Sequence, residues 1–390
     1  MNEANLRVGF IPLIDAAALL VAVDKGFAAT EGLTVDLVRE VSWSNVRDKL
    51  NIGVFDAAHL LAPLAVASSL GVGHVKVALA APFMLGLNGN AITVSPALYD
   101  ALSAAADGKL EDPKISAQAL ARVVTARRRA GEEALTFGMT FPFSTHNYQI
   151  RLWMAAGGVD PDQDVRLVVL PPPYMVDSLS RRQVDGFCVG APWNSIAVEF
   201  GVGRILHFGC DIVARAPEKV LAVRAAWADN RDDVLERFLR ALGGAAAFVN
   251  DPAHVEEVAK LLAAPDRVGV SADIIQRTLK GTLHTAPNGM SRGNSDYILI
   301  ARDGAARPDP IHAAWLYAQM VRWNQAPLSS ELLAAAEACF RPDLYDAALG
   351  ETEKSQSAPP DGIGAFVGPP FEAHDIAGHL AGVKVPVPMR

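Results

Sequence analysis

The sequence predicts an α/β protein of two lobes joined by two chain crossings, and three observations lead to this fold class. Short apolar segments alternate with helical segments from residue 6 to residue 95, which is typical of a mostly parallel sheet covered on both faces. The same alternation begins again near residue 135 and stops near residue 208. Residues 218–224 form a further strand that we expect to return to the first sheet, which leaves a cleft for a ligand between the lobes.

Apolar periodicity and helix end signals place the elements in order. In the first lobe, strands are expected at residues 6–11, 34–39, at a short segment ending near 58, at 75–80 and at 90–95, with helices at 15–25, 44–50 and 62–70. A polar, alanine-rich helical stretch at 96–133 leads into the second lobe. Its strands are expected at 135–139, 165–170, 184–189 and 204–208, with helices after 144, 174 and 192.

This pattern divides the chain into lobe I (residues 1–95 plus 215–349), lobe II (residues 96–214) and a C-terminal tail (residues 350–390). Helices at 232–250, 253–263 and 313–323 complete lobe I. The tail is rich in Pro and Gly, so we expect it to wrap the surface or stay mobile, with one short helix near 374–381.

Composition argues against several classes of protein. A chain of 390 residues with 51% hydrophobic and 20% charged residues is globular and long enough for two cores. The net charge of −8 argues against direct nucleic-acid binding, and no apolar run reaches the roughly 18 residues that a membrane span needs. Three widely spaced cysteines favour a reducing compartment, and the N-terminus leaves no room for an export signal. We therefore expect a cytoplasmic protein.

The strongest candidate for a ligand site is the strand-to-helix turn within residues 135–160. Ser144 or Thr145 can cap the helix that follows the strand. The free N–H groups and the dipole at a helix N-terminus favour an anion. His146 lies in the first helical turn and can donate a further hydrogen bond, although a surface histidine on an ordinary turn is the alternative.

Lys219 is the second candidate, because it lies in an otherwise apolar strand. Burying an ammonium group without a partner is costly, so the partner is either an anionic ligand or a carboxylate such as Glu218. Further candidates lie near the carboxyl ends of expected strands or in the turn before one: Trp43, His59, Asn88, Gly190 and Trp193. Each of these also has a structural alternative, as a core side chain or a turn residue.

Catalytic and cofactor motifs are missing from the sequence. There is no GxSxG, no HExxH, no GxxxxGK[ST] phosphate loop and no GxGxxG that opens a helix after a strand. The histidines and cysteines do not have metal-ligand spacing. We expect no enzymatic activity, no cofactor and no metal.

The sequence resembles the nitrate- and bicarbonate-binding proteins of ABC importers along nearly the whole chain to residue 349. The segments that carry the resemblance are GFIPLIDAAALLVAVDKGF, VSWSNVRDKLNIGVFDAAHLLAP, LNGNAITVS, FPFSTHNYQIRLWMAAGGVDPD, VDGFCVGAPWN and PEKVLAVRAAW. The resemblance implies the two-lobed type II periplasmic-binding-protein fold. It also implies a nitrate ligand, because a lysine in the PEK segment, here Lys219, goes with nitrate in this family. A tryptophan that the nitrate importers use falls at His59 or Leu60 here.

Together with the expected lack of export, the resemblance points to the cytoplasmic nitrate/nitrite sensors of the NasS type. It implies that the chain holds an RNA-binding, ANTAR-type antiterminator partner of the NasT type inactive until the anion binds. Two alternatives stay open. One is the solute-binding protein of a nitrate importer, and the other is an enzyme like those of thiamine-pyrimidine synthesis, which share the fold.

Overall fold

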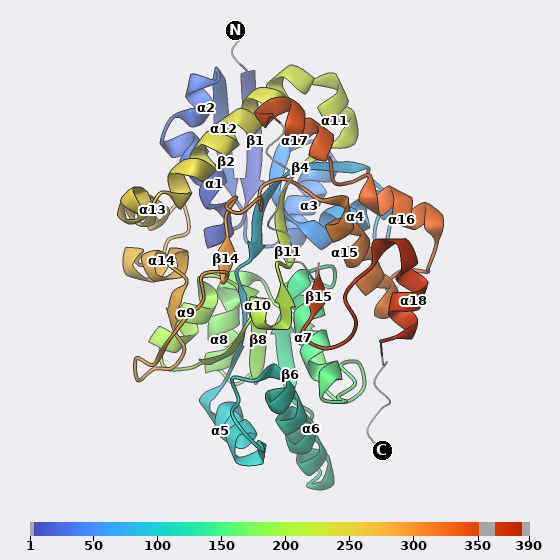
Figure 1. The fold of residues 1–390 in the computed structure, drawn as a ribbon. Helices are drawn as coiled ribbons and strands as arrows, with labels where there is room; N and C mark the ends of the chain where they lie inside the picture. Colours follow the sequence, from blue (N-terminus) through green and yellow to red (C-terminus); the bar gives the residue numbers. More distant parts are fainter. Residues whose placement is uncertain (1–3, 351–362, 384–390) are drawn as a thin grey trace.

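Two β-sheets form the framework of the computed structural model, which describes residues 4–350 and 363–383 (Figure 1). The six-stranded sheet has the order β14-β4-β11-β3-β1-β2, and the five-stranded sheet has the order β7-β6-β8-β5-β9. Strands of the first sheet are β1 (Ala4–Phe10), β2 (Leu33–Arg39), β3 (Ala57–Leu61), β4 (Leu79–Asn88), β11 (Pro217–Arg224) and β14 (Ile298–Leu299). Strands of the second sheet are β5 (Asn90–Val94), β6 (Thr136–Met139), β7 (Arg166–Val169), β8 (Gly186–Gly190) and β9 (Arg204–Phe208). The predicted α/β class is confirmed.

Both sheets are mixed, which corrects the expectation of mostly parallel sheets. In the first sheet β1 pairs in parallel with β2 and β3, whereas β11 runs antiparallel between β3 and β4. In the second sheet β6 pairs in parallel with β7 and β8, whereas β5 runs antiparallel to β8 and β9. The physical reason is the same in both sheets, since β5 and β11 are the strands at which the chain passes from one sheet into the other.

The first crossing lies at Gly89, between β4 and β5. Asn88 has φ 61° and Gly89 has φ 87°, so two successive left-handed residues turn the chain out of one sheet and into the other. Residues 90–94 therefore belong to the second sheet and not, as expected, to the first lobe. The expected strand at 75–80 is also wrong, because the strand found there, β4, begins only at Leu79.

Helices cover both faces of both sheets. One face of the first sheet carries α1 (Ala17–Asp24), α2 (Phe27–Thr30), α12 (Asp232–Asn250), α13 (Val255–Leu262) and α14 (Ala272–Leu279). The other face carries α3 (Trp43–Asn51), α4 (Ala62–Leu70), α15 (Pro310–Arg322) and α16 (Ser330–Glu337). The second sheet is covered by α5 (Pro96–Ala105), α6 (Pro113–Arg129), α7 (Thr145–Ala156) and α10 (Gly209–Ile212) on one side and by α8 (Met175–Ser180) and α9 (Trp193–Glu199) on the other. The remaining elements are α11 (Ala225–Asn230), α17 (Pro342–Leu349), α18 (Ile376–Ala381), the short strands β10 (Val213–Ala214), β12 (Thr282–His284), β13 (Ser291–Gly293) and β15 (Gly364–Ala365), and the 3-10 turns η1 (Ile14–Ala16), η2 (Pro172–Tyr174), η3 (Pro252–His254) and η4 (Ala373–Asp375).

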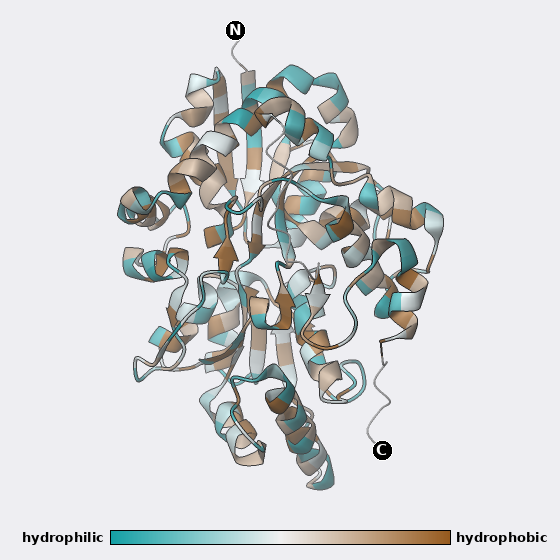
Figure 2. Ribbon diagram, in the orientation of Figure 1, coloured by the Kyte–Doolittle hydropathy of each residue, from teal (hydrophilic) through white to brown (hydrophobic). Residues whose placement is uncertain are grey.

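Apolar side chains fill the layers between sheets and helices. Figure 2 shows hydrophobic strands in the interior and hydrophilic residues on outlying helices such as α6 and α11. Residues at the two ends of α4 show why this helix starts and stops where it does. The helix α4 begins with Pro63 in its first turn and ends at Gly71 with φ 73°. None of the helices described is long and apolar enough to cross a membrane.

The C-terminal segment packs along the second crossing. Strand β15 pairs antiparallel with β10, and the Phe366 N–H donates to the carbonyl of Ile212. Ile363, Phe371 and Ile376 are buried. The expected short helix near 374–381 is confirmed by η4 and α18, which lie against α15. The rest of the tail falls outside the residues described.

Candidate ligand site between the two sheets

The two sheets meet near the carboxyl ends of β1 and β8, and direct hydrogen bonds join them there. The Ile14 N–H donates to the Ala191 carbonyl at 3.0 Å. The Thr145 hydroxyl, in the first turn of α7, donates to the Pro217 carbonyl of β11 at 2.6 Å. These contacts close one lobe against the other, so that the side chains between them are removed from solvent.

Five titratable side chains meet in this closed region, and we call them the buried charge cluster: Asp15, His59, His146, Glu218 and Lys219. The Lys219 Nζ lies 2.9 Å from Asp15 Oδ2 and 2.7 Å from Glu218 Oε1. His59 Nε2 lies 2.9 Å from Asp15 Oδ1, and His146 Nδ1 lies 3.4 Å from Glu218 Oε1. Each of the five is at most 1% exposed, so these charges interact with little screening by water.

Burial and mutual attraction shift the pKa values of four members of the buried charge cluster. Burial opposes the charge on Lys219, yet the two carboxylates raise the pKa of its ammonium above the usual value. Burial also acts to raise the pKa of Asp15, but Lys219 and His59 outweigh it and hold that pKa at about 2. The pKa of His59 is lowered by burial, and the pKa of His146 is lowered by burial to about 4. With neutral imidazoles, two carboxylates and one ammonium give a net formal charge of −1.

Trp43 forms an aromatic wall of the cluster. Its ring centroid lies 5.3 Å from Lys219 Nζ, a cation–π distance, and the ring meets His59 edge-on at 5.5 Å. The placement follows from the sequence, because Ser42 caps α3 and thereby sets Trp43 in its first turn. No group of three or more His, Cys, Asp or Glu side chains among the described residues is arranged to hold a metal ion.

Gly190 marks the point at which polar groups from both sheets converge. A Cβ atom at this position would lie 3.5 Å from Asn90 Oδ1, 3.6 Å from His146 Nε2 and 3.7 Å from Asp15 Oδ2. Neither Asn90 Oδ1 nor His146 Nε2 has a hydrogen-bond partner in the part of the chain described, although both are buried. Buried polar atoms are normally paired, so two unpaired atoms around one point indicate a place for a ligand. We call this point the Gly190 site.

The structure brings most of the predicted site residues together. Lys219, His146 and His59 belong to the buried charge cluster, and Trp43 and Gly190 border it. Asn88 does not join them, because its Oδ1 accepts from the Ala216 N–H and its Nδ2 donates to the Asp296 carbonyl. Trp193 packs against the apolar side chains of the second sheet.

The sequence analysis missed three members of this region: Asp15, Asn90 and, as a site residue, Glu218. Asn90 Nδ2 donates to Glu218 Oε2 at 2.7 Å and to Gln149 Oε1 at 3.0 Å. A usable signal existed for Asp15, since a lone acid within the apolar run PLIDAAALLVA is as unusual as the lysine in β11. The sequence around Asn88 and Asn90 does not show which of the two belongs to the site. The crossing at Gly89 decides this, because it places Asn88 at the end of β4 and Asn90 at the start of β5.

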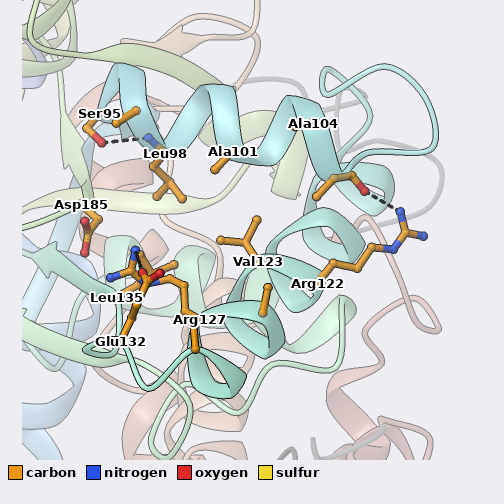
Figure 3. A pocket seen from close by; sticks show the side chains of 14 residues that line it. Ser95, Leu98, Ala101, Ala104, Arg122, Val123, Arg127, Glu132, Leu135 and Asp185 are labelled. Atoms are coloured by element: carbon orange, nitrogen blue, oxygen red, sulfur yellow. Dashed lines mark hydrogen bonds and ion pairs between the residues drawn. The ribbon is translucent and has the colours of Figure 1, made fainter.

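A separate pocket of about 760 Å³ lies between α5 and α6, at the end of the second lobe (Figure 3). Its lining is mostly alanine, leucine and valine, and it includes Arg122 and Arg127. Both guanidinium groups are already paired, Arg122 with Asp107 and the Ala105 carbonyl and Arg127 with Glu132. None of the residues that line this pocket has a buried polar atom without a partner, so the Gly190 site is the stronger candidate.

Comparison with known proteins agrees with this arrangement. Residues 1–263 match the sequence model of the NMT1-like family. The chain belongs to this family. This family assignment, together with the relatives described next, confirms the resemblance to nitrate- and bicarbonate-binding proteins.

Relatives in this family include binding proteins and parts of larger import proteins. The chain is 30% identical over 393 residues to the nitrate/nitrite binding protein NrtA of Synechococcus elongatus, covering 97% of this chain and 86% of that one. It is 32% identical over 347 residues to the nitrate import ATP-binding protein NrtC of Synechocystis sp., but it spans only 50% of that protein's length. The crystal structure of the periplasmic nitrate-binding protein NrtA from Synechocystis PCC 6803 matches with a TM-score of 0.86 and 26% identity, over 98% of this chain and 99% of that one. The predicted periplasmic-binding-protein fold is thereby confirmed.

Proposed function

We propose that this chain binds nitrate or nitrite at the Gly190 site and acts as a cytoplasmic sensor that controls an RNA-binding antiterminator. The observation that carries the first part is the unpaired, buried Nε2 of His146, which lies at the N-terminus of α7 and in the same cluster as the Lys219 ammonium. A helix N-terminus, an imidazole and a fixed cation together suit a small anion. The names of the NrtA relatives support the choice of nitrate and nitrite.

Calorimetric titration of the purified protein tests the ligand. Nitrate, nitrite, bicarbonate and a thiamine-pyrimidine precursor are titrated separately at pH 6.5. We expect heat of binding from nitrate or nitrite and from neither of the other two. Binding of bicarbonate alone would contradict the role of Lys219, and binding of the precursor alone would favour an enzyme of the thiamine-pyrimidine type.

The substitution Gly190→Ala should abolish nitrate binding without harming the fold. The added methyl group meets its neighbours at 3.5–3.7 Å, which is ordinary van der Waals contact, so it fills the space of a ligand atom without a clash. We expect nitrate affinity to fall by more than about 100-fold, and the free energy of unfolding to change by less than about 1 kcal/mol.

Gly293→Ala is the matched control for this substitution. Gly293 lies in the β12–β13 hairpin, away from the site, and a Cβ there meets only Thr282 Oγ1 at 3.9 Å. Nitrate titration of both variants measures the loss of affinity, and urea unfolding of both measures any loss of stability. Unchanged nitrate affinity in a folded Gly190→Ala variant would move the ligand to another place.

The sensor part of the proposal rests on the resemblance. The hydrogen bonds that join the two lobes support a switch between an open and a closed form. An anion held between two lobes stabilises the closed form, and a partner that prefers one form over the other then responds to the anion. The net charge of −8 suits contact with a second, basic protein that binds RNA, and it does not suit direct contact with RNA.

Anion and partner should be linked reciprocally. If nitrate loosens the complex tenfold, the partner must loosen nitrate binding tenfold, about 1.4 kcal/mol of coupling. Size-exclusion chromatography of this protein with its ANTAR-type antiterminator, with and without millimolar nitrate, measures this directly. A complex unaffected by nitrate, or no complex, would favour the second candidate, the solute-binding protein of a nitrate importer, which the import proteins among the relatives support.

A further inference from the structure

The two histidines of the buried charge cluster differ in how their ring nitrogens are used. Each nitrogen of His59 faces a partner: Nδ1 accepts from the Ile11 N–H, and Nε2 lies 2.9 Å from Asp15 Oδ1, an ion-pair distance without hydrogen-bond geometry. His146 has only one nitrogen engaged. Its Nδ1 lies 3.1 Å from Thr140 Oγ1 and 3.4 Å from Glu218 Oε1, whereas its Nε2 has no partner among the described residues and borders the Gly190 site.

This geometry determines what His146 can offer a ligand. Two groups face Nδ1: the Thr140 hydroxyl, which can donate or accept, and Glu218 Oε1, which as a carboxylate oxygen can only accept. The Glu218 contact favours the neutral tautomer that carries its hydrogen on Nδ1. The Nε2 of that neutral ring is then an acceptor, and an acceptor cannot bind the oxygen of an anion. Only the imidazolium has an N–H on both nitrogens. An oxyanion at the Gly190 site therefore needs a proton on Nε2.

Charge balance leads to the same requirement. The groups facing His146 are Asp15 from η1, Glu218 and Lys219 from β11, and His59 from β3, with a net charge of −1 when both imidazoles are neutral. Cys188 of β8 adds no charge, because burial raises the pKa of its thiol well above the usual value. A bound monovalent anion would make the enclosed charge −2, and one added proton returns it to −1. A divalent anion would need two.

We infer that the Gly190 site takes up a monovalent oxyanion together with one proton, which His146 carries on Nε2 and directs at the anion. This inference rests on the proposed function. It assigns His146 to ligand selection, since monovalent anions are accepted with one proton and sulfate is refused. Because burial holds the pKa of the free His146 ring at about 4, the ring is neutral before the anion arrives near pH 6.5, and the proton comes from solution.

The test is calorimetric titration with sodium nitrate at pH 6.5 in two buffers of different ionisation enthalpy, PIPES and imidazole. We expect the heats to differ by the amount that corresponds to uptake of about one proton for each nitrate bound. Nitrate affinity should rise about tenfold for each pH unit lowered, as long as the bound ring stays protonated and the free ring neutral. Sodium sulfate should give no heat of binding.

Two variants locate the proton. His146→Gln keeps an N–H donor but cannot take up a proton, so proton uptake should fall to about zero and the affinity should lose its pH dependence. His59→Gln removes the other histidine of the cluster and should leave the uptake near one, whatever it does to affinity. Uptake that persists in His146→Gln would overturn the assignment.

The wild-type titration alone separates the two proposals. Nitrate that binds with no proton uptake would overturn the inference and leave the proposed function standing. No nitrate or nitrite binding at any pH between about 5 and 8 would overturn the proposed function itself.

Discussion

Replacing Lys219 with methionine should lower the free energy of unfolding by about 3–5 kcal/mol and abolish nitrate binding. Methionine fills a similar volume, but it leaves Asp15 and Glu218 as buried carboxylates without their shared cation. Breaking a buried ion pair by removing one partner exposes the other to the full cost of desolvation. The ammonium that would face the anion is lost at the same time.

Urea unfolding at pH 7.5 and nitrate titration measure the two effects separately. Lys260→Met is the matched control, because Lys260 pairs with Glu256 on the surface, where water screens the two charges and the pair contributes little to stability. The triple variant Lys219→Met, Asp15→Asn, Glu218→Gln should recover much of the lost stability, since it leaves no unpaired charge. A Lys219→Met protein as stable as the wild type would show that the three charges do not depend on one another.

Acid should destabilise the protein at pH values well above those at which Asp15 titrates. His146 and His207 are fully buried, and burial lowers their pKa values from 6.5 to about 4 and about 3. A histidine with a lowered pKa in the folded state binds protons more readily when unfolded, so its contribution to stability is present above pH 6.5 and is lost as the pH falls toward the folded pKa. These shifts correspond to about 3 kcal/mol and about 5 kcal/mol. Asp15 adds to the loss only at lower pH, because its folded pKa is about 2.

Chemical unfolding at pH 7.5, 6.5, 5.5 and 4.5 follows this loss. We expect the free energy of unfolding to fall steeply below pH 6.5, and nitrate to offset part of the fall because the anion raises the pKa of His146. His374→Gln is the control, since the His374 side chain is 82% exposed and its replacement should not alter the curve. A free energy that stays level from pH 7.5 to 4.5 would contradict the neutral, buried state of these rings.

Elements with strong local signals were predicted closely from the sequence. The helices at 62–70 and 232–250 and the strand at 204–208 have the expected bounds. The strand β4 was misplaced because it is apolar up to Leu87, contains Pro82 and Gly86, and has no alternation that would mark its start. The order of strands could not be predicted, since β11 pairs with β3 and β4 across more than a hundred residues.

By itself, the sequence indicated that Lys219 needs an anionic partner, because it lies in a mostly apolar strand where an unpaired ammonium is too costly. It also determined the helix N-terminus that places His146, through the cap at Ser144. Only the tertiary structure decided which groups neutralise the lysine and which nitrogen of His146 is left without a partner. The physical reason is distance along the chain: Asp15 and Lys219 are more than two hundred residues apart and meet at 2.9 Å only because β11 returns to the first sheet after the second lobe has been built.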